Sequence, residues 1–295
     1  MSGLKENTVQ STLCIPLWGR MIAAERYPHL FPDRDAGRIV RELGVDFSGK
    51  QIYRLQYMWM NCLIRQYNLA WEIRHYLEDH PRAAVVELGA GLSCLRREMG
   101  NETNPWYCLD MENVIALRER HIPRGRQERN VVCDLNDFSW FDAIDFCREE
   151  GIIFTAGGLF YYFEKEQVRR LFCAMAERFP GGVITFDAVN ALGLKGVNAE
   201  VKMAGNETKS FFSLERPREE LESWSPRIAD VAERDYCDGY LQGGYRKTIV
   251  TRLFCWVMRR FHMCFMLRAA FREEGLSDCG TGGTASGGEE RRRRA

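Results

Sequence analysis

A glycine turn with an acid just before it is the part of this sequence whose residue types could do chemistry. The segment VVELGAGLSC, residues 85–94, places Gly89 and Gly91 on either side of Ala90 at the end of an apolar run. Glycine adopts backbone torsions that other residues resist, and it lets a backbone approach a ligand closely. Taken alone, this pattern predicts only a turn between a strand and a helix.

Two aspartates that follow the next two apolar runs extend this interpretation. Asp110 ends the strand in WYCLDMEN, where a carboxylate can accept both ribose hydroxyls of an adenosine cofactor, and Asp134 ends the strand in VVCDLND, where it can face the adenine amino group. In a doubly wound sheet, ligands lie beyond the carboxyl ends of the strands. The residues predicted to contact a cofactor there are Glu87, Gly89, Ala90, Gly91, Asp110, Met111, Asp134, Leu135 and Ala156.

The spacing after the second glycine separates two adenosine cofactors. A dinucleotide fingerprint requires a third glycine three residues later, where the pyrophosphate meets a helix. Cys94 occupies that position, and S-adenosylmethionine has no pyrophosphate. Glu87, two residues before Gly89, is also common in methyltransferases of this architecture. The residues therefore favour S-adenosylmethionine, and a NAD oxidoreductase is the least favoured alternative.

Short apolar runs that alternate with helical patterns must position these strand ends. Strands are predicted over 83–88, 106–109, 130–133, 151–155 and 182–186, and helices over 112–120, 140–150 and 165–179. Runs of this kind are typical of a parallel sheet covered on both faces. The last helix has apolar residues at helical spacing, namely Val168, Leu171, Phe172, Met175, Ala176 and Phe179. The alternation predicts an α/β fold with a doubly wound sheet.

The sequence on either side of these alternating strands and helices divides the chain into three predicted parts. Residues 1–79 are predicted to form a mainly helical lid, with one or two helices over 53–77. The cofactor-binding domain spans 80–274 and adds a helix at 217–224, a strand at 228–235, a helix at 245–259 and a last strand at 261–267. The tail at 275–295 is predicted to be disordered, because its glycine-rich, arginine-ended composition offers little to bury.

Composition narrows the class of protein. Basic and acidic residues number 41 each, so no overall field attracts nucleic acid or an anionic membrane. The 11 cysteines include no C-x-x-C pair, which argues against a disulfide scaffold or a structural zinc site. No signal peptide or membrane-spanning apolar run is found. We expect a cytoplasmic protein that binds no metal, with a small molecule as its partner and its oligomeric state left open.

Six segments spread over residues 11–270 carry a family resemblance. They are STLCIPLWGR (11–20), VVELGAGLSCLRR (85–97), WYCLDMENVIALRER (106–120), GGLFYYF (157–163), FPGGVITFDA (179–188) and LESWSPRIADVAERDYCDGY (221–240). Together they resemble the leucine carboxyl methyltransferase superfamily, and more closely its bacterial branch of polyketide-biosynthesis O-methyltransferases of the tetracenomycin type. The resemblance implies a Rossmann-like class I methyltransferase with seven strands, an antiparallel last strand and a helical lid. It also implies an arginine that grips the cofactor's carboxylate, a position that Arg65 matches; a surface arginine is the alternative.

Two departures from the family pattern lie near the cofactor's methionine end. The family usually has GLDTR after its glycines, whereas this chain has GLSCL over 91–95, with Ser93 in place of the acid. Gly157 stands where an acidic residue often precedes the glycine after the fourth strand. Both changes remove polar groups, so a catalytically silent relative that binds the cofactor is one alternative.

Acceptor-binding and catalytic residues are harder to assign. Four aromatic residues are predicted to line the acceptor pocket, with lid packing as the alternative for each: Trp18, Tyr27, Tyr161 and Tyr162. His29 is the one histidine that we would test as a base, and His262 is expected to be a packed core residue. No catalytic residue is assigned, and the lack of a clear base favours a carboxylate acceptor, which is already ionised at neutral pH.

The sequence thus predicts an S-adenosylmethionine-dependent O-methyltransferase that methylates a small molecule, at a carboxylate or at a polyketide-like hydroxyl. The alternative acceptor is the C-terminal carboxylate of a protein. That reaction would require an open groove with basic or polar lid residues such as Arg20, Arg26 and Arg34.

Overall fold

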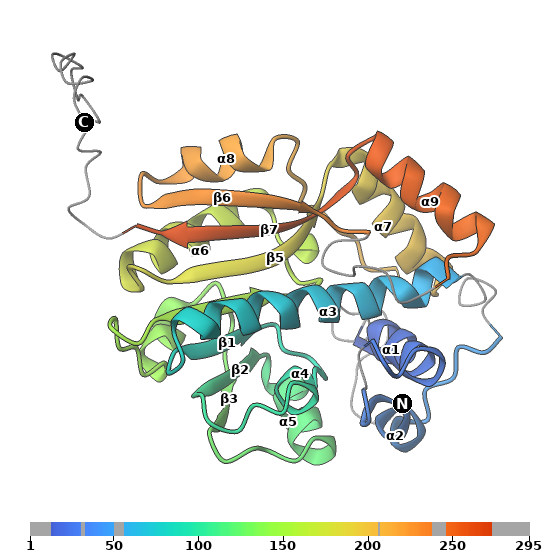
Figure 1. Cartoon of the computed structure of the whole chain (residues 1–295), viewed down its shortest axis with the longest axis horizontal. Coiled ribbons are helices and arrows are strands. Elements are labelled where there is room, and N and C mark those ends of the chain that lie inside the picture. Colours follow the sequence, from blue (N-terminus) through green and yellow to red (C-terminus); the bar gives the residue numbers. More distant parts are fainter. Residues whose placement is uncertain (1–12, 31–32, 50–55, 206, 238–245, 273–295) are drawn as a thin grey trace, which may run out of the picture.

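The architecture is a single mixed sheet with helices on both faces (Figure 1). The computed structural model describes residues 13–30, 33–49, 56–205, 207–237 and 246–272. Within them the strand order is β3-β2-β1-β4-β5-β7-β6. The strands are β1 Ala84–Leu88, β2 Trp106–Asp110, β3 Glu128–Val132, β4 Ile152–Ala156, β5 Val183–Val189, β6 Ile228–Asp235 and β7 Cys264–Phe271. The strands β1 to β5 are parallel, and β7 is antiparallel to β5 and β6. The predicted doubly wound, mostly parallel seven-strand sheet is confirmed.

The helices follow the strands in the order expected for right-handed crossovers. The α-helices are α1 Cys14–Arg26, α2 Ala36–Leu43, α3 Gln56–Asp79, α4 Leu95–Glu98, α5 Glu112–His121, α6 Lys165–Arg178, α7 Ala191–Met203, α8 Pro217–Trp224 and α9 Ile249–Arg260. Two short 3₁₀ helices are η3 Phe138–Ala143 and η4 Phe160–Tyr162.

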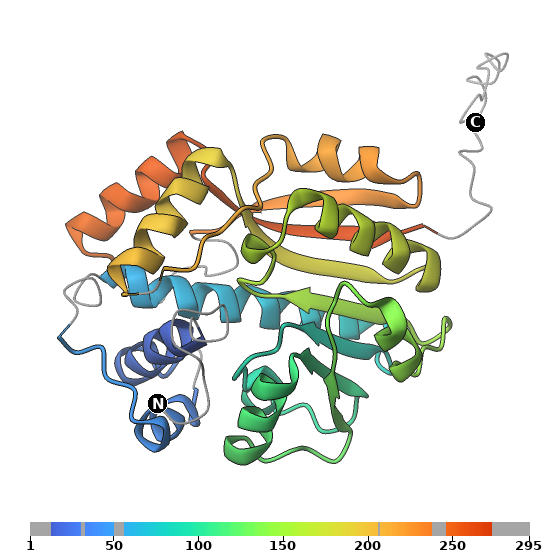
Figure 2. The ribbon, with the colours of Figure 1, turned by 180° about the vertical axis from the view of Figure 1, so that it is seen from behind.

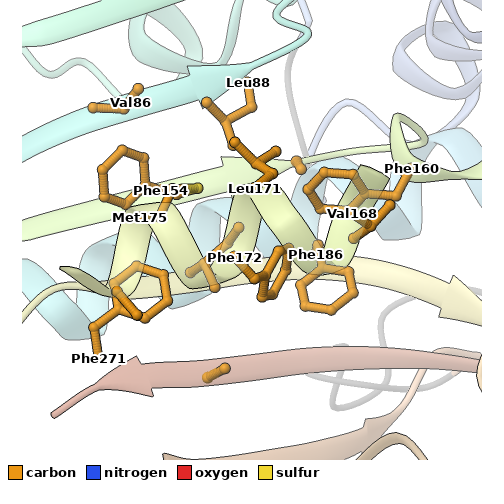
Figure 3. Close-up of a cluster of buried hydrophobic side chains, with 14 of the residues drawn as sticks. Val86, Leu88, Phe154, Phe160, Val168, Leu171, Phe172, Met175, Phe186 and Phe271 are labelled. Carbon is orange, nitrogen blue, oxygen red and sulfur yellow. The ribbon is translucent and has the colours of Figure 1, made fainter. Parts of the chain in front are cut away.

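One face of the sheet is covered by α6, which is seen from its own side in Figure 2. The apolar stripe predicted from the sequence is buried there, and Phe172 packs edge-on against Phe186 of β5 with ring centroids 5.3 Å apart (Figure 3). A capping box between Glu164 and Gln167 starts the helix by satisfying backbone N–H groups that its first turn leaves free. This packed layer fixes the strands whose ends carry the predicted site.

The other face is covered by the long helix α3, which crosses the sheet in Figure 1. Trp59, Leu63 and Ile73 are buried with Val85 of β1 and Trp106 of β2 in one apolar cluster. The helix α1 packs against α3, α2 packs against α1, and both helices lie beyond the strand ends (Figures 1 and 2). The N-terminal helices therefore lie where a lid over the strand ends was predicted.

Two elements differ from the prediction. The predicted helix over 140–150 is wrong: the chain forms η3 and then irregular turns. Trp140 and Phe141 are used there as anchors that pack on Phe179, and the backbone N–H of Asp145 donates to the Tyr107 hydroxyl at 3.1 Å. The helix α7 was not predicted, because glycines at 193 and 196 lower its helix propensity. The Asn190 side chain caps it by accepting from the Gly193 N–H at 2.9 Å.

The C-terminal elements agree in type with the prediction and differ at their ends. The helix at 217–224 and the strand at 228–235 are confirmed. The expected core position of His262 is wrong, since β7 begins only at Cys264 and His262 lies in the preceding turn with φ of 51° and a 68% exposed side chain. The predicted disordered tail at 275–295 lies outside the described residues, and the division at residues 79 and 80 stays a prediction.

Candidate functional site

The glycine turn after β1 is tied to the end of β2. Gly89 and Gly91 have φ values of 60° and 52°, a region that favours glycine. The Ala90 N–H donates to the Leu109 carbonyl at 2.9 Å, and the Gly91 N–H donates to the Asp110 carboxylate at 2.8 Å. The turn is therefore held by the adjacent strand before any ligand arrives.

Asp110 lies at the carboxyl end of β2 and lines a cavity of about 260 Å³, which we call the large cavity. Its second oxygen accepts from the Met111 N–H at 2.8 Å. Burial raises the pKa of Asp110, although the two backbone hydrogen bonds oppose the rise. Each carboxylate oxygen has two lone pairs, so Asp110 can still accept from hydroxyl groups in the cavity.

The residues predicted at the ends of β3 and β4 differ in whether they line the cavity. Asp134 and Leu135 line the same cavity as Asp110, and Asp134 is held by hydrogen bonds from the backbone and side chain of Asn136, both at 2.9 Å. Ala156 ends β4 but is fully buried in the core and lines neither cavity among the described residues. The strand-end half of the cavity, as we define it, consists of Gly89, Asp110, Met111, Asp134 and Leu135.

Glu87 lies below the glycine turn, at a smaller cavity of about 80 Å³ that Ala90, Gly91 and Ser93 also line. Its carboxylate accepts from the Trp106 indole N–H at 2.7 Å. Burial raises the pKa of Glu87, and the nearby Arg118 guanidinium opposes this rise. Glu87 thus links β1 to β2 just before the turn, and it also lines the smaller cavity beside the turn.

Arg65 of α3 lines both cavities. Its Nε donates to the fully buried carboxylate of Asp187 at 2.9 Å. The same carboxylate accepts from the Gly158 N–H at 2.6 Å and from the Tyr161 hydroxyl at 2.8 Å. The two terminal nitrogens of Arg65 form no hydrogen bond with a described residue. They are therefore available to an anionic group of a ligand.

The glycines after β4 make room for this arginine. A Cβ atom on Gly158, whose φ is 70°, would lie 2.6 Å from a terminal nitrogen of Arg65, and one on Gly157 would lie 3.2 Å from its Cδ. An acid at position 157, as the family resemblance led us to expect, would compete for this space. Asp187 of β5 brings a carboxylate to the same place instead.

The predicted aromatic residues separate into two groups. Tyr161 and Tyr162 line the large cavity, whereas Trp18 and Tyr27 line neither cavity among the described residues. Trp18 packs edge-on against Phe47 at 5.9 Å, and Tyr27 stacks on Trp59 at 5.9 Å. Their expected position at the acceptor is therefore corrected to packing within the N-terminal helices.

The histidine considered as a base does not reach the site. His29 is exposed beside Tyr27, with ring centroids 6.0 Å apart, and lies outside the lining of both cavities. Among the described residues, no group of three histidine, cysteine or acidic side chains could hold a metal ion.

Another part of the large cavity's lining comes from residues of α3 and α7 that sequence patterns did not connect to the site. We define this helix half by Met58 and Asn61 of α3 with Val197, Glu200 and Val201 of α7. Asp187 also escaped prediction, although an acid inside the apolar run VITFDAV is a signal that could have found it. Glu200 has no such signal, because its place depends on how α7 packs.

Comparison with known proteins agrees with this geometry. No family model matches the chain. Over 182 residues the chain is 25% identical to the tetracenomycin polyketide synthesis O-methyltransferase TcmP of Streptomyces glaucescens. This alignment covers 61% of this chain and 66% of TcmP. This chain is similar to a methyltransferase of the tetracenomycin type over that segment. The match spans slightly less than two thirds of TcmP.

Two solved structures share the Rossmann-like methyltransferase fold. A Thermobifida fusca protein, whose assignment as a methyltransferase is itself provisional, aligns with a TM-score of 0.58 at 12% identity, over 91% of this chain and 96% of that one. A DUF574 family protein of Streptomyces avermitilis aligns with a TM-score of 0.51 at 10% identity, over 82% and 90%. Among the described helices of this chain, none combines the length and apolar character of a membrane span.

Proposed function

We propose that this protein is an S-adenosylmethionine-dependent O-methyltransferase acting on a small molecule. The observation that carries the proposal is that Gly89, Asp110 and Arg65 line one cavity. In this assignment Asp110 accepts from the ribose hydroxyls, Asp134 faces the adenine amino group, and Arg65 pairs with the cofactor's carboxylate. The bound cofactor supplies a methyl group already activated on a sulfonium.

The charge of the cavity supports this cofactor. Asp110, Asp134 and Glu200 line it, and the positive charge of Arg65 is already paired with Asp187. A cofactor with a sulfonium and an ammonium group gains from carboxylates nearby, whereas the pyrophosphate of NAD would be repelled.

The helix after the glycine turn also argues against NAD. The turn is followed by α4, which has only four residues, Leu95–Glu98. A pyrophosphate relies on the N–H groups and macrodipole at the start of a longer helix. Cys94, which replaces the third glycine, is buried at the N-cap of α4. The dinucleotide alternative therefore lacks both of its usual supports.

The chain's own contribution to methyl transfer is to align the acceptor and exclude water. The helix half is apolar apart from Asn61 and Glu200, which suits a small apolar acceptor. Proximity and orientation of this kind can be worth about 7–11 kcal/mol at best. Methylation of a protein C-terminus receives less support, because Arg20 is buried, paired with Asp33 at 2.5 Å and bonded to the Leu92 carbonyl at 3.0 Å.

Calorimetric titration with S-adenosylmethionine, S-adenosylhomocysteine and NAD tests this proposal. We expect saturable binding of the first two and none of NAD. Asp110→Ala should weaken binding by about ten- to a hundredfold, the range expected for hydrogen bonds to a charged group. Asp142→Ala is the control, since this carboxylate is 87% exposed in η3 and should leave affinity unchanged. Binding of NAD alone, or of none of the three by folded protein, would overturn the proposal.

A further inference from the structure

Glu200 occupies an unusual position in the wall of the large cavity. It lies on α7 with Val197 and Val201, and positions three and four residues apart share one face of a helix. This face lines the same cavity as Met58 and Asn61 of α3. A carboxylate is thus presented among apolar side chains, in the half of the cavity left for the acceptor.

The Glu200 carboxylate has no hydrogen-bond or ion-pair partner among the described residues. The other acids of the site differ in this respect: Asp110 accepts two backbone N–H groups, Asp187 is paired with Arg65, and Glu87 accepts from Trp106. Glu200 is half-buried, and a carboxylate drawn away from water without a hydrogen-bond partner costs free energy, which makes it a candidate functional group.

The surroundings of Glu200 keep its protonation near balance at neutral pH. Burial raises the pKa of Glu200 to about 7, and the Arg65 guanidinium opposes the rise. Burial and the charge of Glu200 raise the pKa of Tyr57 to about 12, so this phenol stays protonated. Among the described residues, the titratable groups around Glu200 or along the same cavity are Tyr57, Cys62 and Arg65 of α3, Cys264 of β7, and Asp110, Cys133, Asp134, Tyr161 and Tyr162. A base with this pKa suits proton transfer at pH 7.

We propose that Glu200 accepts the proton of an acceptor hydroxyl, and that the acceptor is therefore a phenol-like hydroxyl compound. This inference rests on the proposed methyltransferase function. As the acceptor's O–H bond breaks, its proton passes to the Glu200 carboxylate. The acceptor oxygen forms the new bond to the methyl carbon while the methyl–sulfur bond breaks and leaves a neutral thioether. The proton then leaves Glu200 for solvent.

The charge of the cavity decides between the two acceptor classes. A carboxylate acceptor in the helix half would face the Glu200 carboxylate, and like charges there disfavour binding. A neutral hydroxyl group instead donates a hydrogen bond to Glu200, whose carboxylate has no partner among the described residues. The absence of a suitable histidine, which favoured a carboxylate acceptor on sequence grounds, loses its force once Glu200 is placed in the cavity.

The test compares 2-naphthol with 2-naphthoate, which share an apolar body and differ in the acceptor group. Binding of each to the protein with S-adenosylhomocysteine is measured by calorimetry between pH 5.5 and 8.5, for the wild type, for Glu200→Gln and for Lys202→Gln. Lys202 is an exposed residue of the same helix. We expect 2-naphthol affinity to rise about tenfold through pH 7, 2-naphthoate affinity to fall, and both dependences to vanish only in Glu200→Gln. The rate of 2-naphthol methylation should fall by about 10²–10⁴-fold in that variant.

The outcomes separate the inference from the proposed function. If S-adenosylhomocysteine fails to bind, the proposed function itself fails. If it binds but 2-naphthol does not, or if the pH dependence survives in Glu200→Gln, Glu200 is not the proton acceptor. Stronger binding and methylation of 2-naphthoate would assign the acceptor to carboxylates and overturn the inference.

Discussion

The two halves of the large cavity are built in opposite ways. In the strand-end half, polar side chains are fastened to the backbone, as Asp110 is by the N–H groups of Gly91 and Met111. In the helix half, the wall is made mainly of apolar side chains from α3 and α7, and Glu200 is left without a partner among the described residues. A half that is already held in place loses little conformational entropy on binding, so it suits a ligand that never changes.

The hydrogen bonds that hold the strand-end half continue into a layer of buried ion pairs. Glu128 of β3 is paired with Arg96 and Arg118, each at 2.9 Å, and all three side chains are buried. Arg118 also donates to the Ser93 carbonyl at 2.6 Å and to the Gly91 carbonyl at 3.3 Å. The glycine turn is therefore connected through Arg118 to the core of the sheet.

Breaking this layer should have the largest effect on stability. Glu128→Ala leaves two buried arginines with less compensation, so we expect the free energy of unfolding to fall by about 3–5 kcal/mol. Glu102→Ala is the control, because Glu102 also pairs with Arg96 at 2.9 Å but is 64% exposed, and it should cost under about 1 kcal/mol. Urea denaturation measures both. Equal losses in the two variants would show that the buried layer does not brace the turn.

The same difference between the halves decides what the sequence reveals. The strand ends could be predicted because their signals are local: apolar runs give the strands, and Gly89, Gly91, Asp110 and Asp134 follow them directly. The direction of the parallel strands then brings these residues to one edge of the sheet. The methyltransferase resemblance rests on the same segments.

The helix half could not be predicted, because its residues come together only through packing. The glycines of α7 hide its helical character, and nothing near Glu200 in the sequence shows that it faces a cavity. The aromatic residues Trp18 and Tyr27 looked like pocket residues but are used to pack the N-terminal helices. A residue type alone does not distinguish a cavity wall from a core.

A substitution in the helix half should be tolerated better than the same substitution in the core. Val201→Ala enlarges a cavity that already exists, and alanine favours the helix, so we expect a loss of about 1 kcal/mol. Val168→Ala in α6 is the matched control; it opens a new void in a fully buried position and should cost about 2 kcal/mol or more. Calorimetry on Val201→Ala should show unchanged S-adenosylhomocysteine affinity. A larger loss for Val201 than for Val168 would contradict the contrast between the halves.

The smallest effect concerns the seam between the N-terminal helices and α4, next to the strand-end half. Glu98 of α4 accepts from the Arg34 N–H at 3.1 Å, and burial together with the nearby Asp33 carboxylate raises the pKa of Glu98 to about 7. The folded protein thus binds this proton more tightly than the unfolded chain, whose glutamate pKa is about 4.3. The stabilisation is complete below that value and is lost as the pH rises through 7.

Glu98→Gln removes this dependence, so the variant should gain stability relative to the wild type as the pH is raised. We expect the difference in unfolding free energy between variant and wild type to grow by about 1 kcal/mol from pH 5 to pH 8, a value reduced for partial solvent exposure. Urea denaturation at the two pH values measures it, with the exposed Glu112→Gln as control. If the difference in unfolding free energy between Glu98→Gln and the wild type is the same at both pH values, protonation of Glu98 does not contribute to stability. The pH dependence near neutrality that we propose would then belong to Glu200 in the helix half, through acceptor binding rather than through folding of the strand-end half.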